Sequence, residues 1–95
     1  MKLQTAIYEM MCDTNLFPVD SSYYSKDVQQ IILDNADELY KNYPDAVEEK
    51  IRHRVRHLLQ VHKNTNVNKY FDEYKHKRVI DVDMSNPKRY IYTFR

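Results

Sequence analysis

The second half of the chain is rich in side chains that bind nucleic acids. Asn can form paired hydrogen bonds to adenine, Lys can reach guanine or a phosphate, and Arg binds phosphates. Asp72 and Glu73 lie among these residues; they can accept hydrogen bonds from cytosine but repel phosphates. The alternative is an ordinary solvated surface. The polar residues singled out here are Arg52, Arg56, Lys63, Asn66, Asn68, Lys69, Lys75, His76, Lys77, Arg78, Asn86, Lys88 and Arg89.

Two other pairs of residues have spacings that metal sites use. His53 and His57 are four residues apart, which places both imidazoles on one helix face, but a zinc site needs a third ligand and the intervening Arg54 opposes a cation. Asp81 and Asp83 would lie on one side of a strand, although alternating polar residues are typical of any half-exposed strand. We therefore expect no metal and no other cofactor.

Length and composition limit the classes of protein further. Ninety-five residues make one domain with a thin core. Because the chain has no Gly, it cannot form the glycine-rich loops that bind nucleotides, and no Ser-His-Asp or Cys-His pairing can be assembled, so we do not expect an enzyme. The single Cys12 cannot form an internal disulfide. No apolar run has membrane-spanning length and the first residues do not resemble a signal peptide, which predicts a cytoplasmic location without membrane contact.

The net charge of +1 hides a strong asymmetry along the chain. Residues 1–49 hold three Lys or Arg against ten Asp or Glu, a net charge of −7, whereas residues 50–95 hold twelve against four, a net charge of +8. This division predicts a basic face suited to a polyanion. The alternative is that the two halves neutralise each other across their interface.

Apolar spacing predicts three helices before residue 63. The first covers residues 2–12, and the apolar segment 16–19 that follows contains Pro18, which favours an edge strand or an anchored loop. The second is expected to begin with Ser25 as its N-cap and to run without a break to residue 42. Asp45 and Glu48 have the spacing of a capping box for the third, 46–62. The predicted core face of the second helix consists of Val28, Ile31, Ile32, Ala36, Leu39, Tyr40 and Tyr43.

The predicted helix 46–62 separates apolar from cationic side chains. Its apolar arc consists of Val47, Ile51, Val55, Leu58 and Leu59. The opposite arc consists of Lys50, Arg52, His53, Arg56, His57, Gln60 and Lys63. The outer face of this helix is therefore expected to be positively charged.

A short helix and a hairpin are predicted after it. Val67, Tyr70, Phe71 and Tyr74 have helical spacing and predict a helix over 66–77. Two alternating runs, 80–84 and 90–94, are separated by the turn-forming residues 85–88 and predict a β-hairpin. Most of the nine tyrosines have core spacing. Tyr23 and Tyr24 are the expected exposed exceptions, which could stack on the bases of a single strand.

Residues 46–95 resemble a winged helix-turn-helix domain. Leu59-Gln60-Val61-His62 is similar to the family's turn entry, and Val67, Phe71, Tyr74 and Val79-Ile80 match its next apolar positions, although Gln60 and Arg78 stand where Gly is usual. The resemblance implies a mainly α fold with a C-terminal β-hairpin, in which 46–95 is a basic helix-turn-helix plus wing and the polar residues singled out above contact double-stranded DNA. The charge count and the predicted helices add an acidic helical half over 1–45, which begins with an additional N-terminal helix. It also implies that 66–77 enters the major groove of DNA; the alternative register uses 46–62 as the groove helix.

The function expected from this resemblance is transcriptional or replication control by binding double-stranded DNA. A homodimer is expected if the target is palindromic. The alternative function is a protein-binding module, for example a phage-type inhibitor of a host nucleic-acid-handling protein, because fold does not fix function. The composition resembles that of small phage or mobile-element products.

Overall fold

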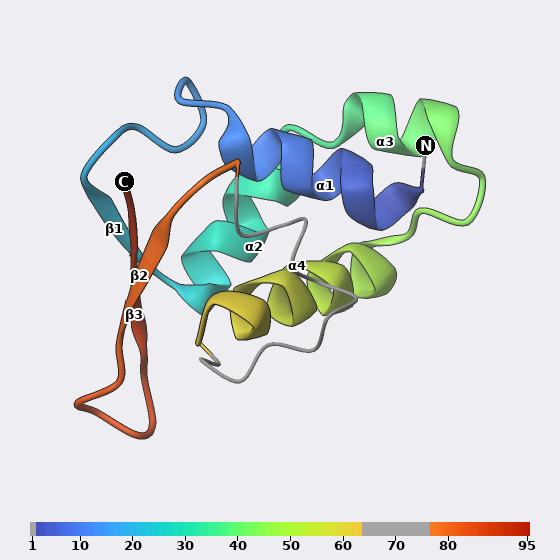
Figure 1. The fold of residues 1–95 in the computed structure, drawn as a ribbon. Helices are drawn as coiled ribbons and strands as arrows, with labels where there is room; N and C mark the ends of the chain where they lie inside the picture. The colour runs from blue at the N-terminus through green and yellow to red at the C-terminus, as the bar shows by residue number, and fades with distance from the viewer. Residues whose placement is uncertain (1, 64–76) are drawn as a thin grey trace.

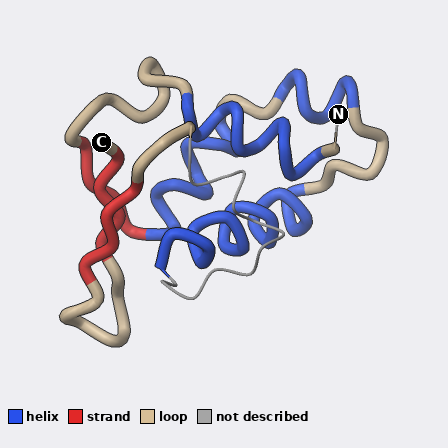
Figure 2. The backbone as a smooth tube through the Cα atoms, viewed as in Figure 1, coloured by secondary structure: helices blue, strands red, loops and turns tan. Residues whose placement is uncertain are grey.

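A computed structural model of the protein describes residues 2–63 and 77–95. In order, these residues form α1 (Leu3–Cys12), β1 (Ser21–Tyr24), α2 (Ser25–Asp34), α3 (Asp37–Asn42), α4 (Glu48–Lys63), β2 (Ile80–Asp83) and β3 (Ile91–Phe94). The helices lie together, and the strands lie at one end of them (Figures 1 and 2). The prediction of a mainly helical fold with a C-terminal hairpin is confirmed. The predicted helix 66–77 lies outside the described residues.

α4 is the central helix and packs against α1, α2 and β2. Its residues Ile51, Val55, Leu58 and Leu59 are almost fully buried, as their spacing predicts. Val47 was expected on the same face but is 52% exposed. The reason is that α4 begins at Glu48, so Val47 precedes the helix. Glu48 is therefore the first helical residue and not the third, as the predicted capping box with Asp45 requires.

The predicted continuous helix over 25–42 is wrong, because the chain leaves helical geometry at Asn35 and Ala36. The Asn35 side chain donates a hydrogen bond to the Ile31 carbonyl at 2.8 Å, which competes with the helix backbone. α3 then starts again with Asp37, and Tyr40, which was expected in the core, is 45% exposed. Ser25 is also not the N-cap of α2. It is the first helical residue, and the preceding Tyr24 occupies the cap position.

The three strands form an antiparallel sheet in the order β1-β3-β2. β2 and β3 are the predicted hairpin, and β1 pairs with the other side of β3, with Tyr24 opposite Ile91. The segment 16–19 is the anchored loop rather than the edge strand, because Phe17 is fully buried and stacks on Phe94 with ring centroids 4.5 Å apart. The edge strand follows it directly.

Tyr8 of α1 gives the fold a testable dependence on pH. Burial raises the pKa of Tyr8 above its ordinary value of 10, because the ionised form is poorly solvated in the core. The contribution of this group to stability is therefore complete below about pH 10 and is lost as the pH rises further, since the unfolded chain loses the proton first. In thermal melts at about pH 9 and about pH 11, the wild type should lose more stability than Tyr8→Phe does. The exposed Tyr40→Phe is the control and should follow the wild type; equal losses in all three proteins would contradict the assignment.

Candidate nucleic-acid interface

A groove of about 530 Å³ separates the start of α2 from the hairpin and reaches α4. β1 runs directly into α2, so the residues that line this side are nearly consecutive (Figure 2). The groove is lined by Tyr24, Ser25, Lys26, Gln29, Arg56, Pro87, Lys88, Arg89, Tyr90 and Tyr92. We call it the basic groove.

The charges that line the basic groove all have one sign in the described part of the chain. Lys26, Arg56, Lys88 and Arg89 come from three separate elements, and neither Asp nor Glu is among the lining residues. Arg56 has an ion pair with Glu49 at 3.8 Å, but both side chains are largely exposed and such pairs contribute little. The groove therefore concentrates positive potential between walls that include apolar ring surface.

An aromatic ring and a guanidinium meet at the mouth of the basic groove. The Arg89 guanidinium carbon lies 3.8 Å from the centre of the Tyr24 ring, a cation–π contact. Tyr24 is 36% exposed and also borders a second hollow of about 230 Å³. Burial raises the pKa of Tyr92 above its ordinary value, because the ionised hydroxyl would be poorly solvated there. Flat aromatic surface and cations therefore lie side by side, as in sites that bind both base and phosphate.

Gln29 is the buried polar residue of the basic groove. It is 4% exposed, donates from Nε2 to the Ser25 hydroxyl at 3.0 Å and accepts at Oε1 from Arg52 at 3.3 Å. Arg52 also binds Gln30 and Glu48, so this guanidinium joins α4 to α2. Arg52 thus has a packing role that the sequence did not indicate, and its contact with a phosphate stays a prediction.

The hairpin turn holds its cations in place through local hydrogen bonds. The Asn86 side chain accepts from the backbone N–H of Lys88 at 3.0 Å, and its carbonyl accepts from the N–H of Arg89 at 3.1 Å. Asp83 accepts two hydrogen bonds from Ser85, which lower the pKa of this carboxyl. Asn86 therefore shapes the turn, and Lys88 and Arg89 extend from it into the basic groove.

Arg78 does not lie on the surface expected of a DNA contact. It is 4% exposed, and its guanidinium donates to the carbonyl oxygens of Phe17 at 2.6 Å and Cys12 at 3.3 Å. It also lies 5.3 Å from the centre of the Phe94 ring. Its predicted phosphate contact is wrong, because this cation joins α1 and its loop to the sheet. The neighbouring Lys77 is exposed but forms an ion pair with Glu9 of α1.

The possible metal ligands are not gathered into a cluster in residues 2–63 and 77–95. The rings of His53 and His57 have centroids 6.2 Å apart, as helical spacing predicts. No group of three or more His, Cys, Asp or Glu side chains that could hold a metal ion is found in the described residues. Asp81 instead binds Arg95 at 2.7 Å, and Arg95 also binds Asp20 at 3.0 Å.

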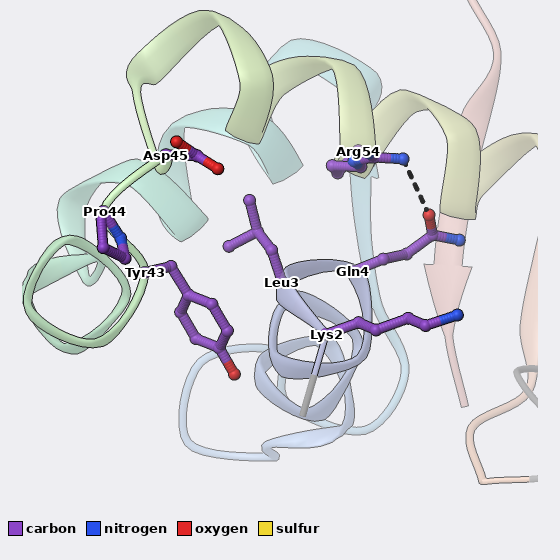
Figure 3. Close-up of a pocket in the computed structure, with 7 residues that line it drawn as sticks. All are labelled: Lys2, Leu3, Gln4, Tyr43, Pro44, Asp45 and Arg54. Atoms are coloured by element: carbon purple, nitrogen blue, oxygen red, sulfur yellow. Dashed lines mark hydrogen bonds between the residues drawn. The ribbon is translucent and has the colours of Figure 1, made fainter.

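A separate hollow, of about 490 Å³ and without Tyr24, lies where the start of α1 faces α4 and the loop after α3 (Figure 3). Tyr43, Pro44 and Asp45 line one side of it, and Arg54 donates a hydrogen bond to Gln4 at 3.3 Å on the other. This hollow combines cations with a carboxylate, so it lacks the single sign of charge that the basic groove has.

The basic groove brings together only some of the predicted contacts. Arg56, Lys88 and Arg89 line it, whereas Lys26 and Gln29 were missed. Tyr24 is exposed as predicted, but the prediction for Tyr23 is wrong, because its ring packs against Phe17 and Phe94 and is half-buried. The available signal for Lys26 was a cation two residues after Tyr24. Lys63 is the last residue of α4. The predicted contacts Asn66, Asn68, Lys69, Lys75 and His76 lie outside the described residues.

Comparisons with family models, with curated proteins and with solved structures found no match for this chain. No helix in the described part of the chain has the length and apolar character that crossing a membrane requires.

Proposed function

We propose that this protein binds double-stranded DNA as a winged-helix factor, in the manner of a transcriptional or replication-control protein. The observation that carries the proposal is the basic groove, in which four cations from α2, α4 and the hairpin converge without a carboxylate among its described lining. Cations that neutralise phosphates supply most of the non-specific affinity for DNA. The order helix, strand, helices and hairpin, with β1 paired to β3, suits the winged-helix arrangement.

In this proposal the duplex lies across α4 and the hairpin turn. The side of α4 opposite its buried residues exposes Lys50, His53 and Arg56. Lys88 and Arg89 extend this surface from the hairpin. Phosphates would bind Arg56 and Lys88, and since both side chains are exposed, neither must leave a buried partner to do so.

The test is binding of a short blunt duplex of random sequence, measured by fluorescence anisotropy between about 50 mM and about 200 mM salt. The wild type should bind at low salt and weaken steeply as salt rises. Arg56→Ala/Lys88→Ala should bind about tenfold or more weakly, and its log–log salt slope should be smaller by about 2, since each lost phosphate contact removes about 0.9.

The control is Lys2→Ala/Lys41→Ala, which removes the same charge at the exposed start of α1 and from α3, the helix farthest from the hairpin (Figure 1). It should keep the affinity and salt slope of the wild type. Equal losses in both double variants would show that net charge rather than the basic groove sets binding. Absence of duplex binding at low salt would overturn the proposal in favour of a protein partner.

A further inference from the structure

The basic groove has features that the backbone of a duplex does not need. A duplex presents phosphates at its surface and keeps its bases stacked inside, so its backbone can bind a tyrosine hydroxyl but leaves the face of the ring without a stacking partner. Yet Tyr24 borders the groove with a ring that is 36% exposed, and Arg89 already covers part of it at 3.8 Å. Bases that have left a duplex stack on aromatic rings and on guanidinium planes.

We propose that the basic groove binds an unpaired nucleotide, so that the preferred ligand is duplex DNA that carries a single-stranded extension. This inference rests on the proposed DNA binding and names the substrate class of the same site. The volume of about 530 Å³ lies within the range of sites that enclose small organic ligands, which gives room for one nucleotide. The base stacks beside Tyr24 and Arg89, and Lys26 binds the phosphate of the extension.

Gln29 forms part of the wall of the groove beside that base and is held in place by the protein. Its amide is held by Ser25 at 3.0 Å and by Arg52 at 3.3 Å, so the amide has one orientation before any ligand binds. An amide has two N–H donors and two acceptor lone pairs, and the two bonds use one of each.

The experiment compares three probes: a blunt duplex, the same duplex with a short single-stranded extension, and the extension strand alone. The wild type should bind the extended duplex at least tenfold more tightly than either of the other probes. Tyr24→Leu should lose about 5- to 150-fold in affinity for the extended duplex, the range for one stacked base. Its affinity for the blunt duplex should fall much less, by no more than the loss of the Tyr24 support for Arg89 causes. Tyr24→Phe keeps the ring and should keep the preference.

A second measurement does not depend on any substitution. The fluorescence of 2-aminopurine in the extension should be quenched when the wild type binds, because stacking quenches this base. Lys26→Ala should weaken binding of the extended duplex more than that of the blunt duplex. Three results would overturn the inference: lack of quenching, equal affinity for the blunt and extended duplexes, or equal losses on both probes in Tyr24→Leu. Binding of the blunt duplex would still support the proposed function in each case. Loss of blunt-duplex binding itself would instead overturn the proposed function.

Discussion

Replacement of Arg78 by Met is expected to lower the free energy of unfolding by about 2–4 kcal/mol. The substitution keeps an apolar stem of similar length but removes the donors to the Phe17 and Cys12 carbonyls, at 2.6 and 3.3 Å. A hydrogen bond from a charged donor contributes about 1.5–3 kcal/mol, and a buried acceptor left without a donor costs about 1–3 kcal/mol. Burial of the Arg78 guanidinium itself costs free energy, because its Nε has no hydrogen-bond partner among the described residues. The Met variant no longer has this cost, which offsets part of the loss.

The measurement is thermal or urea unfolding of Arg78→Met beside Arg95→Met. Arg95 is about half exposed and binds two exposed carboxylates, so the same substitution there should cost less than about 1 kcal/mol. For a domain of this size, the loss at Arg78 corresponds to a melting temperature lower by roughly 10–25 °C. If both variants melt within about 3 °C of each other, Arg78 does not join the elements as proposed.

Periodic patterns predicted the elements that bury one clear face. In α4 the arc residues Ile51, Val55, Leu58 and Leu59 are buried, and in the hairpin Ile80, Tyr92 and Phe94 are buried at alternate positions. Each pattern repeats with the period of its element, and burial of that face stabilises the element wherever the partner lies. For this reason the sequence sufficed for the type of these elements and for the hairpin.

The apolar pattern of the sequence did not predict the break in the helix after α2. Ala36 and Leu39 continue the apolar spacing of Val28 and Ile32, and all four residues are buried. Buried positions show which face of a segment packs on the core, but they do not show that the backbone between two such positions remains helical. The hydrogen bond from Asn35 to Ile31 is a local competitor of the helix, and it favours the break without a change in the pattern.

The cations show why the site was only partly predicted. Arg56, Lys88 and Arg78 look alike in a sequence, since all three lie in the basic half. Arg78 differs because its neighbours in space are two carbonyl groups of residues more than sixty positions earlier. Lys26 lies in the acidic half, yet β1 and α2 place it opposite the hairpin in the basic groove. Assignment of these charges requires the tertiary structure.

Replacement of Phe94 by Ala is expected to lower the free energy of unfolding by about 3–5 kcal/mol, the range for a buried phenylalanine. Phe94 is fully buried, stacks on Phe17 with centroids 4.5 Å apart and meets the edge of Tyr23 at 5.6 Å. Its loss would leave a cavity where β3, the loop before β1 and Arg78 meet. The exposed Val79→Ala, at 56% exposure, is the control and should change stability by less than about 0.5 kcal/mol.

The combination of Phe94→Ala with Phe17→Ala tests whether the two rings act as one unit. Phe17→Ala alone should also cost about 3–5 kcal/mol, because this ring is fully buried. For residues in contact, the interaction energy in a double-mutant cycle is about 0.5–3 kcal/mol. The double variant should therefore lose less stability than the sum of the two single losses. Urea unfolding of the four proteins measures that difference. Strict additivity would mean that the stack does not hold the loop onto the sheet, and that β1 keeps its place beside β3 through its backbone pairing alone.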